Sequence, residues 1–104
     1  MSSVTEAWKA WQEGLANKDS SKLGEFFTDD FQFVPKAGTK NRQETLDWVA
    51  AGGNPTSIDD LEVLYENDEV AVIYHIANRP HVVMALYTKR GDKFSHCRTV
   101  RQEV

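Results

Sequence analysis

The stretch LEVLYENDEVAVIYHIA, residues 61–77, carries the pattern that decides the fold. It is typical of two β-strands joined at Asn67-Asp68, because these residues tolerate the left-handed backbone of a tight hairpin loop. Pairing Glu66 with Glu69 sets large apolar or aromatic side chains opposite one another, since side chains alternate along a strand. We therefore predict that one face of this hairpin covers the core, with the side chains of Leu61, Val63, Tyr65, Val70, Val72 and Tyr74.

The length and composition of the sequence are those of an ordinary soluble globular protein. A chain of 104 residues suffices for one domain, residues 1–104. The net charge of −4 argues against nucleic-acid and anionic-membrane partners, because both bind basic surfaces. The single cysteine, Cys97, permits no internal disulfide, and the first residues lack the pattern of a signal peptide. We expect a cytoplasmic protein with no nucleic-acid and no membrane partner.

Helices are expected mainly in the first half of the chain. Ser3-x-x-Glu6 is a capping box that predicts a helix over residues 4–18, which carries a wide apolar stripe. Capping residues at 19–21 predict a second, shorter helix. Asn41-x-x-Glu44 predicts the start of a third helix, which ends at about residue 51 before a glycine pair.

Strands are expected at residues 31–34, from about residue 57 through the hairpin to 77, at 81–89 and at 93–103. Helices that precede a long antiparallel meander predict an α+β fold. Three N-terminal helices would pack on a strongly curved, mainly antiparallel sheet. Because a bent sheet and a long helix cannot close on each other everywhere, we expect a cone with an internal pocket.

Several stretches match one known family in their order and spacing. They are Trp11-x-x-x-Leu15-x-x-x-Asp19, Leu23-x-x-Phe26-Phe27-Thr28-Asp29-Asp30-Phe31, Pro35, and the turn from Tyr87 to Phe94. With these features the chain resembles the nuclear transport factor 2-like superfamily, in its SnoaL-like and ketosteroid-isomerase-like branch, a cystatin-like α+β fold. The resemblance implies an apolar cone whose mouth admits small ligands. Members include isomerases, polyketide cyclases, hydrolases and non-catalytic dimerisation modules, so the fold leaves the chemistry open.

The catalytic set of the ketosteroid isomerases is missing from the sequence. The resemblance implies a tyrosine donor on the first helix, an aspartate base before the proline and a protonated acid on the third long strand. These positions fall on Trp11, Val34 and about Met84. Neither a base nor an acid remains, so steroid-type isomerase activity is not expected.

His96 is the first candidate catalytic residue. If the last turn has three loop residues, His96 and Arg98 share the concave face with Phe94, where they can bind or polarise an anionic or carbonyl ligand. If the loop has two residues, the inward side chains are instead those of Ser95, Cys97 and Thr99. The structural alternative for His96 is an ordinary strand histidine at the edge of the sheet.

Asp30 is the second candidate catalytic residue, because it lies where a helix ends and a strand begins, near the expected mouth of the cone. Local turn hydrogen bonds are the commoner role of such an aspartate. His75 is expected outside the pocket, across from Asp60, in an ion pair or a dimer interface.

Aromatic rings are expected to line the pocket, because the helices of so short a chain do not fill a cone that holds many flat rings. The predicted ligand-binding residues are Trp8, Trp11, Phe27, Phe31, Phe33, Trp48, Met84 and Arg98. No cofactor and no metal site are expected, since His96 and Cys97 are adjacent on a strand and point to opposite faces.

Two functions compete on these grounds. The first is a pocket that binds a small apolar carbonyl or acidic molecule, with or without a cyclase, isomerase or hydrolase reaction. The second is a non-catalytic homodimerisation module that pairs through the outer face of the sheet. The apolar residues expected on that face are Leu64, Ala71, Ile73, Val83, Ala85 and Tyr87.

Overall fold

The computed structural model describes residues 3–35, 38–53 and 56–103. It contains an α+β fold of three helices and one mixed six-stranded sheet that does not close into a barrel. The elements are α1 (Val4–Asn17), α2 (Ser21–Gly24), β1 (Phe27–Val34), β2 (Lys40–Asn41), α3 (Arg42–Ala50), β3 (Ile58–Glu66), β4 (Val70–Ala77), β5 (His81–Arg90) and β6 (Lys93–Glu103). None of these helices is both long enough and apolar enough to cross a bilayer.

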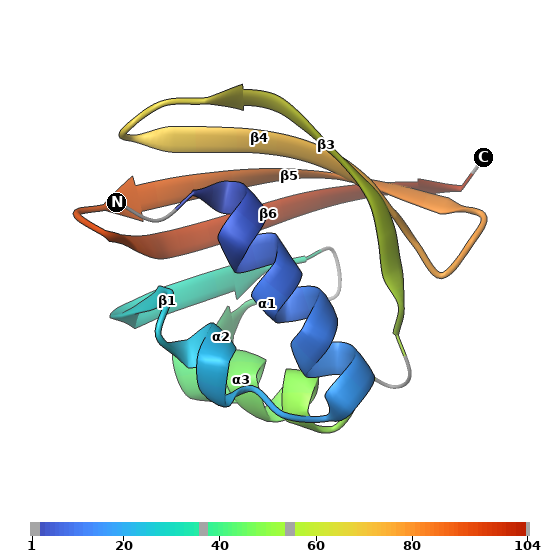
Figure 1. Cartoon of the computed structure of the whole chain (residues 1–104), viewed down its shortest axis with the longest axis horizontal. Coiled ribbons are helices and arrows are strands. Elements are labelled where there is room, and N and C mark those ends of the chain that lie inside the picture. The colour runs from blue at the N-terminus through green and yellow to red at the C-terminus, as the bar shows by residue number, and fades with distance from the viewer. Residues whose placement is uncertain (1–2, 36–37, 54–55, 104) are drawn as a thin grey trace.

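The sheet has the strand order β2-β1-β6-β5-β4-β3. Neighbouring strands are antiparallel except β1 and β6, which run parallel. The predicted meander from β3 to β6 is confirmed, whereas the first strand begins at Phe27, earlier than expected. Figure 1 shows α1 crossing one face of the sheet, with α2 and α3 beside it near β1. The three helices therefore leave the other face of the sheet uncovered among the residues that the structure describes.

Both long helices begin where their capping boxes predict. The Ser3 hydroxyl accepts a hydrogen bond from the Glu6 amide at 3.2 Å, and the Glu6 carboxylate accepts one from the Ser3 amide at 3.2 Å. Asn41 and Glu44 make the same reciprocal pair at the start of α3. The Gln12 amide on α1 donates to the Ile58 carbonyl at 2.7 Å, which fixes the beginning of β3 against the helix.

The predicted register of the β3–β4 hairpin is wrong. Two irregularities in β3 shift the pairing, so that Tyr65 lies opposite Val72 rather than Val70. Side chains alternate, and β4 consequently turns its small residue Ala71 and its branched residue Ile73 inward, both fully buried. Val63 and Tyr65 are 39% and 56% exposed.

The β5–β6 hairpin settles the orientation of the last strand. Arg90 pairs with Lys93, which leaves a two-residue loop, and the register shifts once between Thr88 and Lys89. This β-bulge turns both Phe94 and Cys97 toward the core, where each is 1% exposed. Cys97 and Thr99 therefore face inward as expected for the two-residue loop, and Phe94 is buried as well.

Candidate functional site

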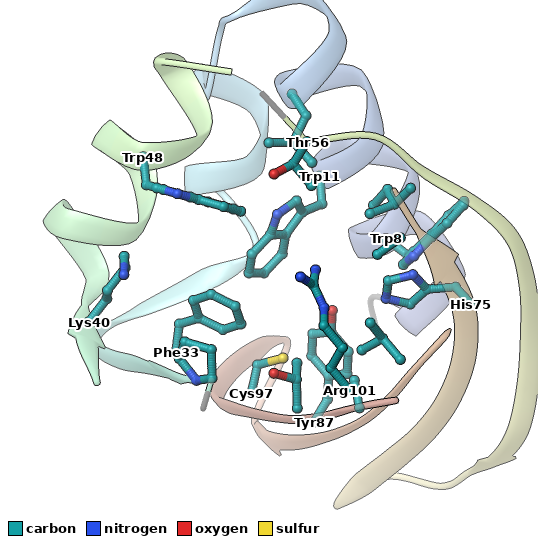
Figure 2. A pocket seen from close by; sticks show the side chains of 17 residues that line it. Trp8, Trp11, Phe33, Lys40, Trp48, Thr56, His75, Tyr87, Cys97 and Arg101 are labelled. Atoms are coloured by element: carbon teal, nitrogen blue, oxygen red, sulfur yellow. The ribbon is translucent and has the colours of Figure 1, made fainter. Parts of the chain in front are cut away.

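A cavity of about 650 Å³ lies between the helices and the covered face of the sheet. Figure 2 shows the 17 side chains that line it. The size matches that of sites for small organic ligands, roughly 300–1,000 Å³. The lining comes from α1, α3 and the sheet: Trp8, Trp11, Leu15, Phe33, Pro35, Lys40, Trp48, Thr56, Ile58, His75, Ala77, Val83, Ala85, Tyr87, Cys97, Thr99 and Arg101.

Four of the predicted ligand-binding residues line this cavity. Trp8 and Trp11 come from the inner side of α1, where the spacing of three residues puts them on one face of the helix. Phe33 on β1 lies between Trp11 and Trp48 of α3, with ring centroids 5.2 Å and 6.2 Å away. The rings of Trp11, Phe33 and Trp48 form one continuous aromatic wall, and Figure 2 shows Trp8 apart from it, beside His75.

Four others of the predicted set lie elsewhere. Phe27 and Phe31 stack on each other at 3.7 Å and fill the core instead of lining the cavity. Met84 and Arg98 lie on the uncovered face of the sheet, because the inward positions of β5 and β6 are Val83, Ala85, Cys97 and Thr99. The facing of β5 is therefore the opposite of the expected one, whereas β6 follows the two-residue-loop alternative.

Neither predicted catalytic residue reaches the cavity. His96 follows the bulge in β6 and points to the opposite face from Cys97. Asp30 is exposed, accepts a 2.8 Å hydrogen bond from the Thr28 hydroxyl and pairs with Arg90. The Thr28 hydrogen bond and then the Arg90 guanidinium hold the pKa of Asp30 below its usual range. The local-turn role is therefore the one that Asp30 has.

His75 is a cavity-lining residue that the predicted register missed. It is 7% exposed and lines the cavity from β4, whereas the expected position was outside the pocket. Its ring lies 5.8 Å from that of Trp8, at an angle of 59°. The sequence held a signal for this position, because His75 alternates with the small or branched inward residues of β4, which are Ala71, Ile73 and Ala77.

The protonation state of His75 follows from its surroundings. Burial lowers the pKa of His75 below its usual range, and the charge of Arg101 lowers it further, against the opposing effect of a hydrogen bond to Ile76. Nδ1 lies 3.1 Å from the Ile76 carbonyl oxygen. A carbonyl only accepts, so Nδ1 carries the proton and Nε2 of the neutral ring is left as an acceptor.

Tyr87 and Cys97 form a neutral hydrogen-bonded pair at the floor of the cavity. Burial raises the pKa of Tyr87 well above its usual range. Burial also raises the pKa of the Cys97 thiol to about 12, although the hydrogen bond with Tyr87 works in the opposite direction. A thiol nucleophile reacts as the thiolate, so Cys97 is unsuited to nucleophilic catalysis.

The charged groups of the cavity are both cationic. Lys40 on β2 and Arg101 on β6 are in the lining, and Figure 2 shows Arg101 extending toward the middle of the space. No aspartate or glutamate is found among the described lining residues. The positive charge of the lining is opposite in sign to the net charge of the chain, which has 16 acidic and 12 basic residues. Such a lining suits an apolar molecule with a negative charge or a polarised oxygen, and it lacks the carboxylates that commonly hold Mg²⁺ or Ca²⁺.

Comparisons with known proteins identify the fold. No sequence profile of a known family matches the chain, and no curated sequence is significantly similar to it. Solved structures do match. A nuclear transport factor 2-like protein from Anabaena variabilis superposes with a TM-score of 0.79 at 17% identity, covering 97% of this chain and 87% of that one.

Two further solved structures extend the match. A candidate isomerase from Rhodopseudomonas palustris gives a TM-score of 0.76 at 12% identity, over 99% of this chain and 91% of its own. A Catenulispora acidiphila protein with a ketosteroid isomerase-like fold, solved with trimethylamine, gives 0.64 at 17% identity over 91% and 84%. Sequence identities this low show similarity of fold only. The fold of this chain is the nuclear transport factor 2-like fold.

Proposed function

We propose that the protein binds a small, largely apolar molecule that carries a carboxylate or a strongly polarised carbonyl. The observation that carries this proposal is the cavity lined by aromatic rings with Lys40 and Arg101 and with no acidic residue among the described lining. Apolar contact with the rings supplies most of the binding free energy, and the cations select the sign of the ligand charge.

The comparisons support a ligand-binding use of this fold. The Catenulispora protein was solved with trimethylamine, and the Rhodopseudomonas protein is described as a candidate isomerase. An amine is the opposite of what the present cavity favours, because the described lining offers no carboxylate to a cation. A reaction of the isomerase, cyclase or hydrolase type would need a proton acceptor, and Nε2 of His75 is the group available in the cavity.

The test uses three naphthalene probes of the same shape. Naphthoate is an anion, naphthamide is neutral and naphthylmethylamine is a cation at neutral pH. We expect naphthoate to bind most tightly by isothermal calorimetry, and Arg101→Met to weaken it by about fivefold, as for a partly exposed charge-assisted contact. Arg98→Met is the matched control, because Arg98 lies on the same strand and faces away from the cavity. Equal affinity for the anion and the cation would contradict the proposal.

A second function, homodimerisation through the uncovered sheet face, has its own supporting observation. The residues originally expected there are mostly buried on the inner face: Ala71, Ile73, Val83, Ala85 and Tyr87. A different apolar row takes their place, since Tyr74 pairs with Met84 and Met84 with Val100 across three strands. Met84 and Val100 are 48% and 66% exposed. We propose that a second copy of this chain covers this row.

The dimer proposal is tested by sedimentation equilibrium at micromolar concentration. We expect a dimer for the unmodified chain and a monomer for Met84→Glu, because a charge in the centre of an apolar interface is left without a partner. Ala16→Glu on the exposed side of α1 is the control and should remain dimeric. A monomeric unmodified chain would overturn this proposal and leave the ligand-binding proposal untouched.

A further inference from the structure

The corner of the cavity formed by Trp8 and His75 contains an unused donor and an unused acceptor. Trp8 is 5% exposed, and its indole Nε1 is buried with no hydrogen-bond partner among the described residues. His75 uses Nδ1 on the Ile76 carbonyl, and Nε2 has no hydrogen bond within the described part of the chain. Buried donors are almost always satisfied in folded proteins, so the unpartnered Trp8 N–H calls for an explanation.

The two groups are close to each other and to the cavity. Their ring centroids are 5.8 Å apart, and both residues belong to the lining. Figure 2 shows Trp8 and His75 side by side at one end of the space, with Arg101 extending toward its middle. A group that enters this corner meets an N–H donor on one side and an imidazole acceptor on the other.

We propose that the Trp8–His75 corner is a hydroxyl subsite, so that the ligand is a hydroxylated apolar acid. A hydroxyl group is the smallest group that accepts from Trp8 Nε1–H and donates to His75 Nε2 at the same time. The carboxylate of the same molecule lies toward Arg101. This inference rests on the proposed function, and it specifies the second polar group of the ligand.

The surroundings of His75 support the role of acceptor. The charged or titratable groups near it in the cavity are Arg101 from β6 and the Tyr87–Cys97 pair from β5 and β6. Arg101 disfavours a second positive charge on the imidazole, and Tyr87 and Cys97 are uncharged at neutral pH. The ring therefore stays neutral, and its Nε2 accepts rather than donates.

A hydroxyl subsite of this kind gives strong discrimination. A ligand that lacks the hydroxyl leaves the buried Trp8 N–H without a partner, and that penalty is larger than the loss of a contact at the surface. We expect at least one positional isomer of hydroxynaphthoate to bind about tenfold more tightly than naphthoate at neutral pH. The indole N–H resonance of Trp8 should move further with that isomer than with naphthoate, because only the isomer places a hydroxyl beside it.

Variants of His75 and Trp8 test whether the preference for the hydroxylated ligand arises in this corner. His75→Phe and Trp8→Phe should each reduce the preference for the hydroxylated ligand to less than about threefold, while naphthoate still binds. His96→Phe is the matched control, because this histidine does not line the cavity, and it should keep the full preference. Circular dichroism establishes that each variant is folded, and the indole resonance of the unmodified protein provides a measurement that needs no variant.

The outcomes separate the two proposals. Tight binding of naphthoate with no gain from any hydroxyl isomer overturns the subsite and leaves the proposed function standing. A hydroxyl preference that persists in both His75→Phe and Trp8→Phe also overturns the subsite. If neither naphthoate nor any hydroxynaphthoate binds, both proposals are wrong.

Discussion

Burial determines the chemistry of the two reactive side chains in the cavity wall, His75 and Cys97. Both lie on the inward side of their strands, and the cavity adds apolar surface around them. Desolvation disfavours the charged form of any group, so it lowers the pKa of the imidazole and raises that of the thiol. The wall thus offers neutral hydrogen-bonding groups, and its charge comes from Lys40 and Arg101.

The thiol of Cys97 is expected to resist labelling in the folded protein. Its pKa of about 12 and its burial leave almost no reactive thiolate at neutral pH. Reaction with a disulfide reagent should be at least about 100-fold slower in buffer than in guanidinium, where the chain is open. The measurement is the release of thionitrobenzoate, and rapid labelling of the folded chain would contradict the placement of Cys97.

His75 is expected to destabilise the fold at acidic pH. Its pKa is lowered in the folded state, so below about pH 6.5 the unfolded chain binds a proton that the folded chain does not. The free energy of unfolding should therefore fall as the pH drops from about 6.5 to the folded pKa, and His75→Phe should reduce that fall.

Urea unfolding at a series of pH values measures this effect. The control is the range from about pH 7.5 to 8.5, where histidine is neutral in both states, so that the unmodified chain and the variant should show equal slopes. Equal slopes in the acidic range as well would show that His75 is not buried as described.

At the scale of the elements, the carboxylate of Glu66 links α1, β3 and β5. Glu66 at the end of β3 accepts a hydrogen bond from the Val4 amide at 2.7 Å, in the first turn of α1. It also pairs with the Lys89 ammonium at 2.8 Å. The Lys89 side chain is only 4% exposed and lies 5.8 Å from the centroid of the Phe94 ring. Glu66 therefore neutralises a buried charge and satisfies a free amide at a helix start.

Glu66→Gln is expected to lower the free energy of unfolding by about 2 kcal/mol, because it leaves the buried Lys89 ammonium without a counter-charge. Asp60→Asn is the matched control. It removes a 2.8 Å ion pair with Arg79 whose side chains are both about two-thirds exposed, so it should change the stability by less than about 0.5 kcal/mol. Urea denaturation compares the two, and equal effects would contradict the role given to Glu66.

Local features of the elements were predictable from the sequence, and long-range features were not. The capping boxes at Ser3 and Asn41 depend on residues three apart, so their sequence pattern specifies their hydrogen bonds. The pairing of β4 with β3 depends on two irregularities in β3 that the expected pairing of Glu66 with Glu69 does not contain. His75 was missed because that pairing put Val70, Val72 and Tyr74 inward. Arg101 was missed because the facing of β6 depends on the length of its loop and on the bulge between Thr88 and Lys89.

At the scale of the whole molecule, the two faces of the sheet differ in what they carry. The covered face carries the cavity, with small residues of β4 and β5 beneath the aromatic wall of α1, β1 and α3. The uncovered face carries the apolar row of Tyr74, Met84 and Val100. The resemblance to the superfamily held although the predicted facing of the hairpin did not, because the order of elements carried the resemblance.

The most direct measurement of the central proposal uses the tryptophans. All three in the chain line the cavity, so their indole N–H resonances report on its occupation. In a titration with naphthoate, we expect the signals of Trp8, Trp11 and Trp48 all to move and saturate together, and naphthylmethylamine to leave them nearly unmoved. Three signals that stay in place with naphthoate, or that respond equally to the amine, would contradict this proposal.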